Sequence, residues 1–297
     1  MSAQNNISLY NFLDRQIELF KGNFLTTRAS MDQEAIHQMR VAVKKINAIY
    51  KLKKHIDFPV TIDKKLFDII SAIYGSSGKL RDVQLQHNLL YHYRKELKFG
   101  FTALQVLLNE SETELEEQLM SVVAEIDPAS LEAASQSSGL PENLQNLAGI
   151  ERESIIFIYR KIEKIEKLML LIQNEKFVHE LRKQVKQLFF VLQFLHSHFP
   201  ESTFGNYDLK PFQLVGDRLG QWNDRSMFIQ RINAFVALQE PNFISENAEY
   251  YLLLKSVEDD KRSLLKNVDL MLYMEMINLK ALFPETDGSN QVEIPKN

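Results

Sequence analysis

Residues 36–54 read Ile36-His37-Gln38-Met39-Arg40-Val41-Ala42-Val43-Lys44-Lys45-Ile46-Asn47-Ala48-Ile49-Tyr50-Lys51-Leu52-Lys53-Lys54. At about 100° per residue, an α-helix places a polar set within a sector of roughly 80°: His37, Arg40, Lys44, Asn47 and Lys51. The opposite face is apolar and carries Met39, Ala42, Ile46 and Ile49. No carboxylate occurs from Arg40 to Lys54. A helix with cations of one sign on its polar face indicates an anionic ligand.

The composition of the whole chain restricts the possible classes of protein. The 297 residues are 45% hydrophobic, which is enough for a buried core. The net charge of -4 argues against a general nucleic-acid binder, and any anion site must be local. The absence of cysteine excludes disulfides and thiolate chemistry. We find neither a signal-peptide pattern nor an apolar run of about 18 residues, and therefore expect a soluble, cytoplasmic protein without membrane contact.

Helical periodicity runs through the sequence, and no segment shows the alternation of a β-strand. We therefore predict an all-α fold, with helices at 7–28, 36–54, 66–73, 80–97, 101–126, 150–173, 176–198, 209–238, 243–254 and 259–283. Ser30 and Gln33 resemble a capping box before the second helix. Gly75-Ser76-Ser77-Gly78 is predicted to interrupt the third. The stretch 127–149 is rich in helix breakers and is predicted to be a boundary.

An internal repeat connects the two halves of the chain. The motif His-x-x-Arg-x-x-x-Lys occurs at His37-Arg40-Lys44 and again 142 residues later, at His179-Arg182-Lys186. Gly-x-x-x-Asp occurs at Gly78-Asp82 and, at the same offset, at Gly220-Asp224. Two matches at one offset predict an internal duplication with a basic helix in each half.

These motifs resemble the CHAD domain family (conserved histidine α-helical domain), and the resemblance spans roughly residues 7–283. It implies two up-and-down helical bundles, about 1–140 and 146–285, within one domain of residues 1–285, followed by a flexible tail at 286–297. The basic helices would face a central groove that binds inorganic polyphosphate or another phosphate polyanion, without catalysis and without a cofactor. Association with polyphosphate granules would be consistent with this. The implied binding residues are His37, Arg40, Lys44, Lys45, His179, Arg182 and Lys186.

Further residues are assigned from the chemistry of the two helices. Arg40 and Arg182 would position phosphate oxygens with their planar guanidinium groups, while Lys51 and Lys183 would add positive charge. Asn47, Gln187 and Phe189 stand where the family tends to place further cations, so the second helix has a depleted basic face.

The motif aspartates and histidines allow other interpretations. Asp82 and Asp224 are predicted to stabilise a helix N-terminus or to pair with Arg81 or Arg225. His37 and His179 are surrounded by cations, which disfavours a metal site. One alternative is a phosphate-metabolism enzyme that uses His37 or His179. Another is a helical interaction scaffold that has lost polyphosphate binding, in which carboxylates neutralise the cations on the polar face of the basic helix.

Overall fold

The computed structural model describes residues 2–56, 62–136, 138, 147–240, 243 and 247–283, and this part of the chain is helical with no β-strand. The predicted all-α class is therefore confirmed. The predicted tail at 286–297 lies outside the described residues, as does most of 137–146 within the predicted boundary. Within the described part, no helix combines the length and apolarity needed to cross a bilayer.

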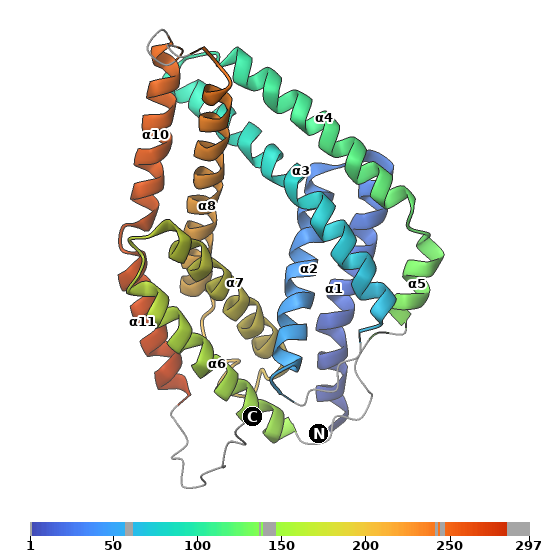
Figure 1. Ribbon diagram of the computed structural model, residues 1–297. Helices are drawn as coiled ribbons and strands as arrows, with labels where there is room; N and C mark the ends of the chain where they lie inside the picture. The colour runs from blue at the N-terminus through green and yellow to red at the C-terminus, as the bar shows by residue number, and fades with distance from the viewer. Residues whose placement is uncertain are drawn as a thin grey trace, which may run out of the picture.

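Two groups of helices lie side by side, one from each half of the chain (Figure 1). The first group consists of α1 Ser2–Ser30, α2 Gln33–Lys53, α3 Lys64–Leu97, α4 Thr102–Ala124 and α5 Pro128–Gln136. The second consists of α6 Leu147–Met169, α7 Glu175–His198, α8 Lys210–Ala237, α10 Ala248–Leu265 and α11 Val268–Leu282. The groups meet where α2 packs against α7 and α3 packs against α8. The internal duplication remains a prediction from the sequence.

Buried apolar side chains form two clusters that hold the helices together. The larger cluster joins α1 and α2 to α6 and α7, with Ile46, Ile162 and Leu188 fully buried. The second lies where the distal half of α3 and α4 meets α8 and α10, and it includes Tyr93 and Phe228. Both clusters join the first half of the chain to the second, so the interface between halves is part of the hydrophobic core.

The chain runs through Gly75-Ser76-Ser77-Gly78 as one helix, so the predicted interruption of α3 is wrong. Glycine disfavours a helix by only about 1 kcal/mol relative to alanine, and packing on both sides outweighs this cost. Ile73, Ser77 and Leu80 are buried along the α3 face that crosses the glycines.

Several helix ends differ from the sequence prediction. Asp32 caps α2 by accepting a hydrogen bond from the Ala35 amide at 2.7 Å, whereas Ser30 ends α1, so the predicted capping box is wrong. The unpredicted helix α5 follows Asp127, whose carboxylate accepts from two amides of its first turn. The last two helices meet at Asn267, which has a positive φ of 63°. This junction lies after residue 265 and not between residues 254 and 259 as predicted.

Candidate functional site

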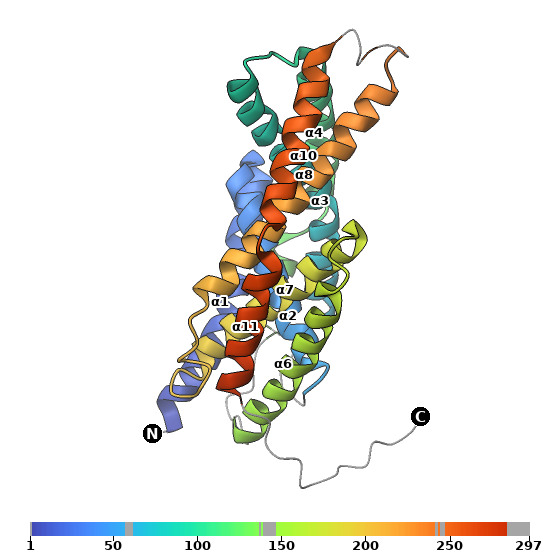
Figure 2. The same cartoon turned by 90° about the vertical axis from the view of Figure 1, so that its left-hand side faces the viewer.

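The middle parts of α2, α3, α7 and α8 surround the centre of the molecule (Figure 1). Each of these helices packs against at least two of the others, so side chains from both halves can meet there. Figure 2 shows that α10 and α11 run along one side of the molecule, while α2 and α7 lie deeper. The two basic helices predicted from the repeat therefore lie at the junction of the halves.

Arg40 is held rigidly at this junction by residues of α3. Its Nη1 donates hydrogen bonds to the Tyr74 carbonyl at 2.6 Å and to Ser77 Oγ at 3.0 Å. The guanidinium carbon lies 4.3 Å from the centre of the Tyr74 ring, which is a cation–π contact. A Cβ atom at Gly78 would lie 3.4 Å from Nη1. The first motif glycine therefore gives the arginine room to pack against α3.

Lys44 shows that cations from both halves converge. Burial, together with the positive charges of Arg40, Arg182 and Lys186, lowers its pKa to about 8, while Asp224 opposes the shift. The side chain nevertheless retains solvent contact. A side chain that is both crowded by protein atoms and accessible to water lies on a concave part of the surface. An anion bound beside the ammonium group would therefore favour its protonated, charged form.

Arg81 and Arg182 complete the group of cations on α3 and α7. Burial lowers the pKa of both, and Asp82 and Asp224 act in the opposite direction on both. The Nε atom of each arginine is buried without a hydrogen-bond partner among the described residues. A buried guanidinium N–H without an acceptor is unusual, and the donor capacity of these two atoms is unused within the described part of the chain.

We define the central basic cluster as Arg40, Lys44, Arg81, Arg182 and Lys186. Asp82 and Asp224 lie among these cations, and burial is the main cause that raises the pKa of each carboxylate. Both aspartates lie well inside α3 and α8, so their predicted role at a helix N-terminus is wrong. With five cations and two aspartates, the cluster has an excess of positive charge.

The two motif histidines lie beside the central basic cluster. Burial and the charges of Arg81, Lys44 and Arg40 lower the pKa of His37, while Glu34 opposes them, so the ring is neutral at pH 7. His179 Nδ1 lies 2.9 Å from Asn223 Oδ1 on α8. Neither ring has a hydrogen bond to a carboxylate in the described part of the chain.

Three predicted binding residues, and Arg225 as the predicted partner of Asp224, lie away from the cluster or are engaged by other groups. Lys45 points to α1, 5.9 Å from the centre of the Phe12 ring, and Lys183 forms an ion pair with Glu180 at 3.1 Å. Lys51 lies near Lys161 of α6, whose pKa its charge lowers. Arg225 forms an ion pair with Asp260 at 3.2 Å, so its predicted pairing with Asp224 is wrong.

Lys186 belongs to the cluster but is partly neutralised. Its Nζ lies 2.8 Å from Asp217 Oδ1 of α8. Its charge still contributes to lowering the pKa of Lys44. The second basic helix therefore brings less free positive charge to the centre than its motif suggests.

Three residues that shape this region were not identified from the sequence. Tyr74 and Ser77 hold Arg40; Ser77 lies in the segment that was predicted to interrupt the helix, and Tyr74 directly precedes it. Lys161 of α6 donates hydrogen bonds to Oε1 of both Gln184 and Gln187 at 2.9 Å. The repeat does not include Lys161, and helical periodicity predicted only a helix around it.

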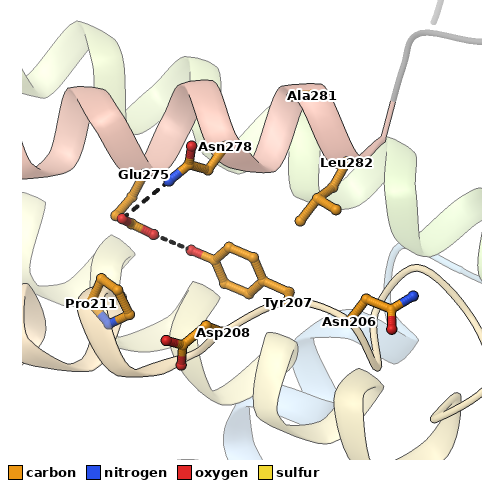
Figure 3. Close-up of a pocket in the computed structure, with 8 residues that line it drawn as sticks. All are labelled: Asn206, Tyr207, Asp208, Pro211, Glu275, Asn278, Ala281 and Leu282. Carbon is orange, nitrogen blue, oxygen red and sulfur yellow. Dashed lines mark hydrogen bonds between the residues drawn. The ribbon is translucent and has the colours of Figure 1, made fainter.

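A separate pocket of about 370 Å³ lies between α11 and the segment that leads into α8 (Figure 3). In it, the Tyr207 hydroxyl donates to the buried carboxylate of Glu275 at 2.5 Å, and Asn278 donates at 3.4 Å. Its lining includes the carboxylates of Asp208 and Glu275 and no Lys, Arg or His. This pocket is unsuited to an anion, which leaves the central basic cluster as the anion-binding candidate.

The arrangement favours electrostatic capture of an anion. Rigid guanidinium groups and an ammonium group of lowered pKa meet on a concave surface, and such groups bind phosphate oxygens through charge-assisted hydrogen bonds. Among the described residues, no group of three or more His, Asp or Glu side chains is placed to hold a metal ion.

Comparison with known proteins points to one family. The family model for the CHAD domain matches residues 11–233. The fold is similar to the crystal structure of the CHAD domain from the plant Ricinus communis, with a TM-score of 0.55 and 17% sequence identity over 93% of this chain and 90% of that chain. At this identity the likeness concerns the fold alone. Among curated proteins, no sequence matches this chain.

Proposed function

The chain belongs to the CHAD domain family, and we propose that it binds inorganic polyphosphate through the central basic cluster without catalysing a reaction. The family is associated with polyphosphate binding. The observation that carries the proposal is the environment of Lys44, where burial and, after it, cations from α2 and α7 lower the pKa of the ammonium group. Cations held this close repel one another, and a polyanion would remove that repulsion.

Polyphosphate matches the cluster because its negative charges repeat along a flexible chain. Lys44 and Lys186 provide mobile point charges, and the arginines provide directed donors. The buried Nε–H groups of Arg81 and Arg182 have no acceptor among the described residues, and a phosphate oxygen would supply one if the side chains shift to admit it. Binding of such a chain would release counterions and weaken with added salt, as at other phosphate backbones.

Arg40 would contribute through its rigidity. Two hydrogen bonds and the contact with Tyr74 hold its guanidinium group before any ligand binds. Less side-chain entropy is then lost on binding than for a free surface arginine. The remaining N–H groups of the guanidinium can donate to phosphate.

The test is the double variant Arg40→Glu/Arg182→Glu, measured by fluorescence anisotropy with long-chain polyphosphate. We expect binding to be lost while the helical circular dichroism stays unchanged, because the substitutions reverse two central charges. The matched control is Arg152→Glu/Arg262→Glu, which makes the same charge change at exposed positions of α6 and α10. Equal affinity of the two double variants would contradict the site.

A second candidate function is a helical scaffold that has lost the ligand. It is favoured by the ion pairs of Lys183 with Glu180 and of Lys186 with Asp217, which neutralise part of α7. This candidate requires that wild-type protein and the Arg40→Glu/Arg182→Glu variant both fail to bind polyphosphate at low salt.

A further inference from the structure

A second group of cations lies where α6 passes the C-terminal half of α2. We call it the α6 basic cluster and define it as Lys51, Arg160, Lys161 and Lys164. The charges of Lys51 and Lys164 both contribute to lowering the pKa of Lys161, and Arg160 and Lys161 both lower the pKa of His55. Residues of α2 and α6 that are far apart in sequence therefore bring their charges together.

Lys161 is fixed in place by neutral groups. Its Nζ donates to Oε1 of Gln184 and of Gln187, at 2.9 Å each, and lies 5.4 Å from the centre of the Phe157 ring. An ammonium group has three N–H donors, so these two hydrogen bonds leave one donor for another acceptor. The two glutamine oxygens orient the charge of Lys161 without neutralising it.

Carboxylates compensate this cluster only in part. Glu180 is the acid whose charge acts on Lys161, and it is already engaged by Lys183 at 3.1 Å, Lys164 at 3.4 Å and Gln184 at 2.6 Å. Lys51, Arg160 and Lys161 form no ion pair among the described residues. Burial and the neighbouring lysines hold the pKa of Lys161 at about 8, as at Lys44.

The α6 basic cluster replaces charge that α7 lacks. Phe189 is buried in the core, and Gln187 uses its side-chain oxygen to hold Lys161. The depleted positions of α7 are thus accompanied by a lysine from the neighbouring helix. Seven residues separate Lys44 from Lys51, which is about 10 Å along α2. The central and α6 basic clusters are therefore neighbours along α2.

We propose that the α6 basic cluster is a second phosphate-binding subsite, centred on Lys161, which receives the same polyphosphate chain as it leaves the central basic cluster. This inference rests on the proposed function. It assigns to α6 a role that the repeated motif does not contain, and it makes affinity depend on chain length, because only a long chain reaches both clusters.

The variant Lys161→Met tests this subsite, since methionine keeps the length of the side chain and removes its charge. We expect the affinity for long-chain polyphosphate to fall about tenfold, with a salt dependence reduced by about one charge. The affinity for tripolyphosphate should be unchanged, because the shorter anion occupies the central basic cluster alone. The matched control is Lys255→Met, at an exposed position of α10.

Two results would overturn the subsite. One is an unchanged affinity of Lys161→Met for the long chain relative to Lys255→Met. The other is an equal loss for the long chain and for tripolyphosphate, which would place Lys161 in a single site or give it a structural role. Thermal unfolding of Lys161→Met separates these, because only a structural role lowers the melting temperature. If wild-type protein binds neither anion, the proposed function fails and the subsite fails with it.

Discussion

The two basic helices carry the same motif but differ in what surrounds their cations. On α2, Arg40 and Lys44 form no ion pair with a carboxylate in the described part of the chain. On α7, Lys183 pairs with Glu180 and Lys186 pairs with Asp217. The offset of 142 residues aligns Glu180 with Gln38, and Asp217 with Gly75. Lys183 is not a motif residue, so Asp217 is the carboxylate that offsets a motif cation of α7, and a residue outside the motif thus determines how much of its charge is free.

A repeated cation motif therefore does not by itself specify a repeated anion site. Arg40 is held by a backbone carbonyl and a hydroxyl, which leave its charge in place. Lys186 is held by a carboxylate, which offsets its charge. We therefore expect α2 to contribute most of the binding free energy, and Arg182 of α7 to contribute a smaller part.

The largest expected effect separates the two motif arginines. Arg40→Glu should weaken polyphosphate binding by at least about 100-fold, because it reverses a fixed charge and breaks charge-assisted hydrogen bonds. Arg182→Glu should have a smaller effect, because the charges of Asp224 and Asp82 both act on Arg182, whereas Asp82 is the carboxylate that acts on Arg40. Anisotropy titrations of both single variants measure the ratio. A larger loss for Arg182→Glu would reverse the comparison of the helices.

The pH dependence of tripolyphosphate binding, which uses the central basic cluster alone, should come from Lys44 of α2. Lys44 has a pKa of about 8 in the free protein, and bound phosphate favours the protonated form. Between pH 7 and 9 the free protein loses this charge, so affinity should fall roughly tenfold at constant ionic strength. Lys44→Arg should flatten the profile, since arginine stays protonated. A wild-type profile that is flat from pH 7 to 9 would contradict the lowered pKa.

The same lysine predicts the opposite trend for stability without ligand. Its pKa is about 8 in the folded state and ordinarily 10.5, so the unfolded chain binds more protons between these values. The contribution of Lys44 to the free energy of unfolding should therefore rise as the pH increases from 8 to 10.5. Urea unfolding of wild type and Lys44→Met across this range measures it. The free energy of unfolding of Lys44→Met should rise less over this pH range than that of the wild type. Identical slopes for the two proteins would argue against a lowered pKa of the ammonium group.

Removing the carboxylates of α7 should make it more like α2. In Glu180→Gln/Asp217→Asn, Lys183 and Lys186 lose their ion partners while side-chain size is kept. We expect a gain in affinity of about three- to tenfold, because exposed ion pairs contribute about 1 kcal/mol or less and their loss frees Lys183 and Lys186, and also Lys164, which pairs with Glu180. Glu112→Gln/Asp269→Asn makes the same charge change elsewhere. An equal gain in this control would mean that only the net charge matters.

The smallest effect concerns the two motif glycines. A Cβ at Gly78 would meet Arg40 Nη1 at 3.4 Å, whereas a Cβ at Gly220 meets nothing within 4 Å. Both glycines lie inside helices, so Gly220→Ala should raise the free energy of unfolding by up to about 1 kcal/mol. Gly78→Ala should gain less, because Arg40 must shift, and only this variant should lose affinity. If the two variants have the same affinity and the same free energy of unfolding, Gly78 has no role in positioning Arg40.

The sequence predicted much of the fold because helical periodicity reports burial directly. The all-α class was predicted correctly. The basic helix α2 lies close to its predicted position, and so do the ends of α4, α7 and α8. The break at Gly75-Ser76-Ser77-Gly78 was wrong because packing by Ile73 and Leu80 outweighs glycine's weak helix propensity. Asp32 replaced Ser30 as the cap because α1 extends further than its apolar pattern indicated.

For the candidate site, spacing within one helix predicted which residues could face the centre. Arg40, Lys44 and Arg182 do converge there, as their charges on one another show. Spacing could not predict partners from other helices. Asp217 on α8 engages Lys186 of α7, and Gln187 of α7 holds Lys161 of α6. These contacts depend on how helices cross, which a pattern in one helix does not contain.

The most direct test is the binding of long-chain polyphosphate to the wild-type protein at two salt concentrations, with sulfate and duplex DNA as competitors. The account predicts tight binding that weakens steeply at the higher salt concentration, because several phosphate charges are neutralised at once. It also predicts poor competition by DNA, since a flexible single chain can follow a concave surface that a stiff duplex cannot. Absence of binding at low salt would contradict the account, and would favour a scaffold that has kept the fold without the ligand.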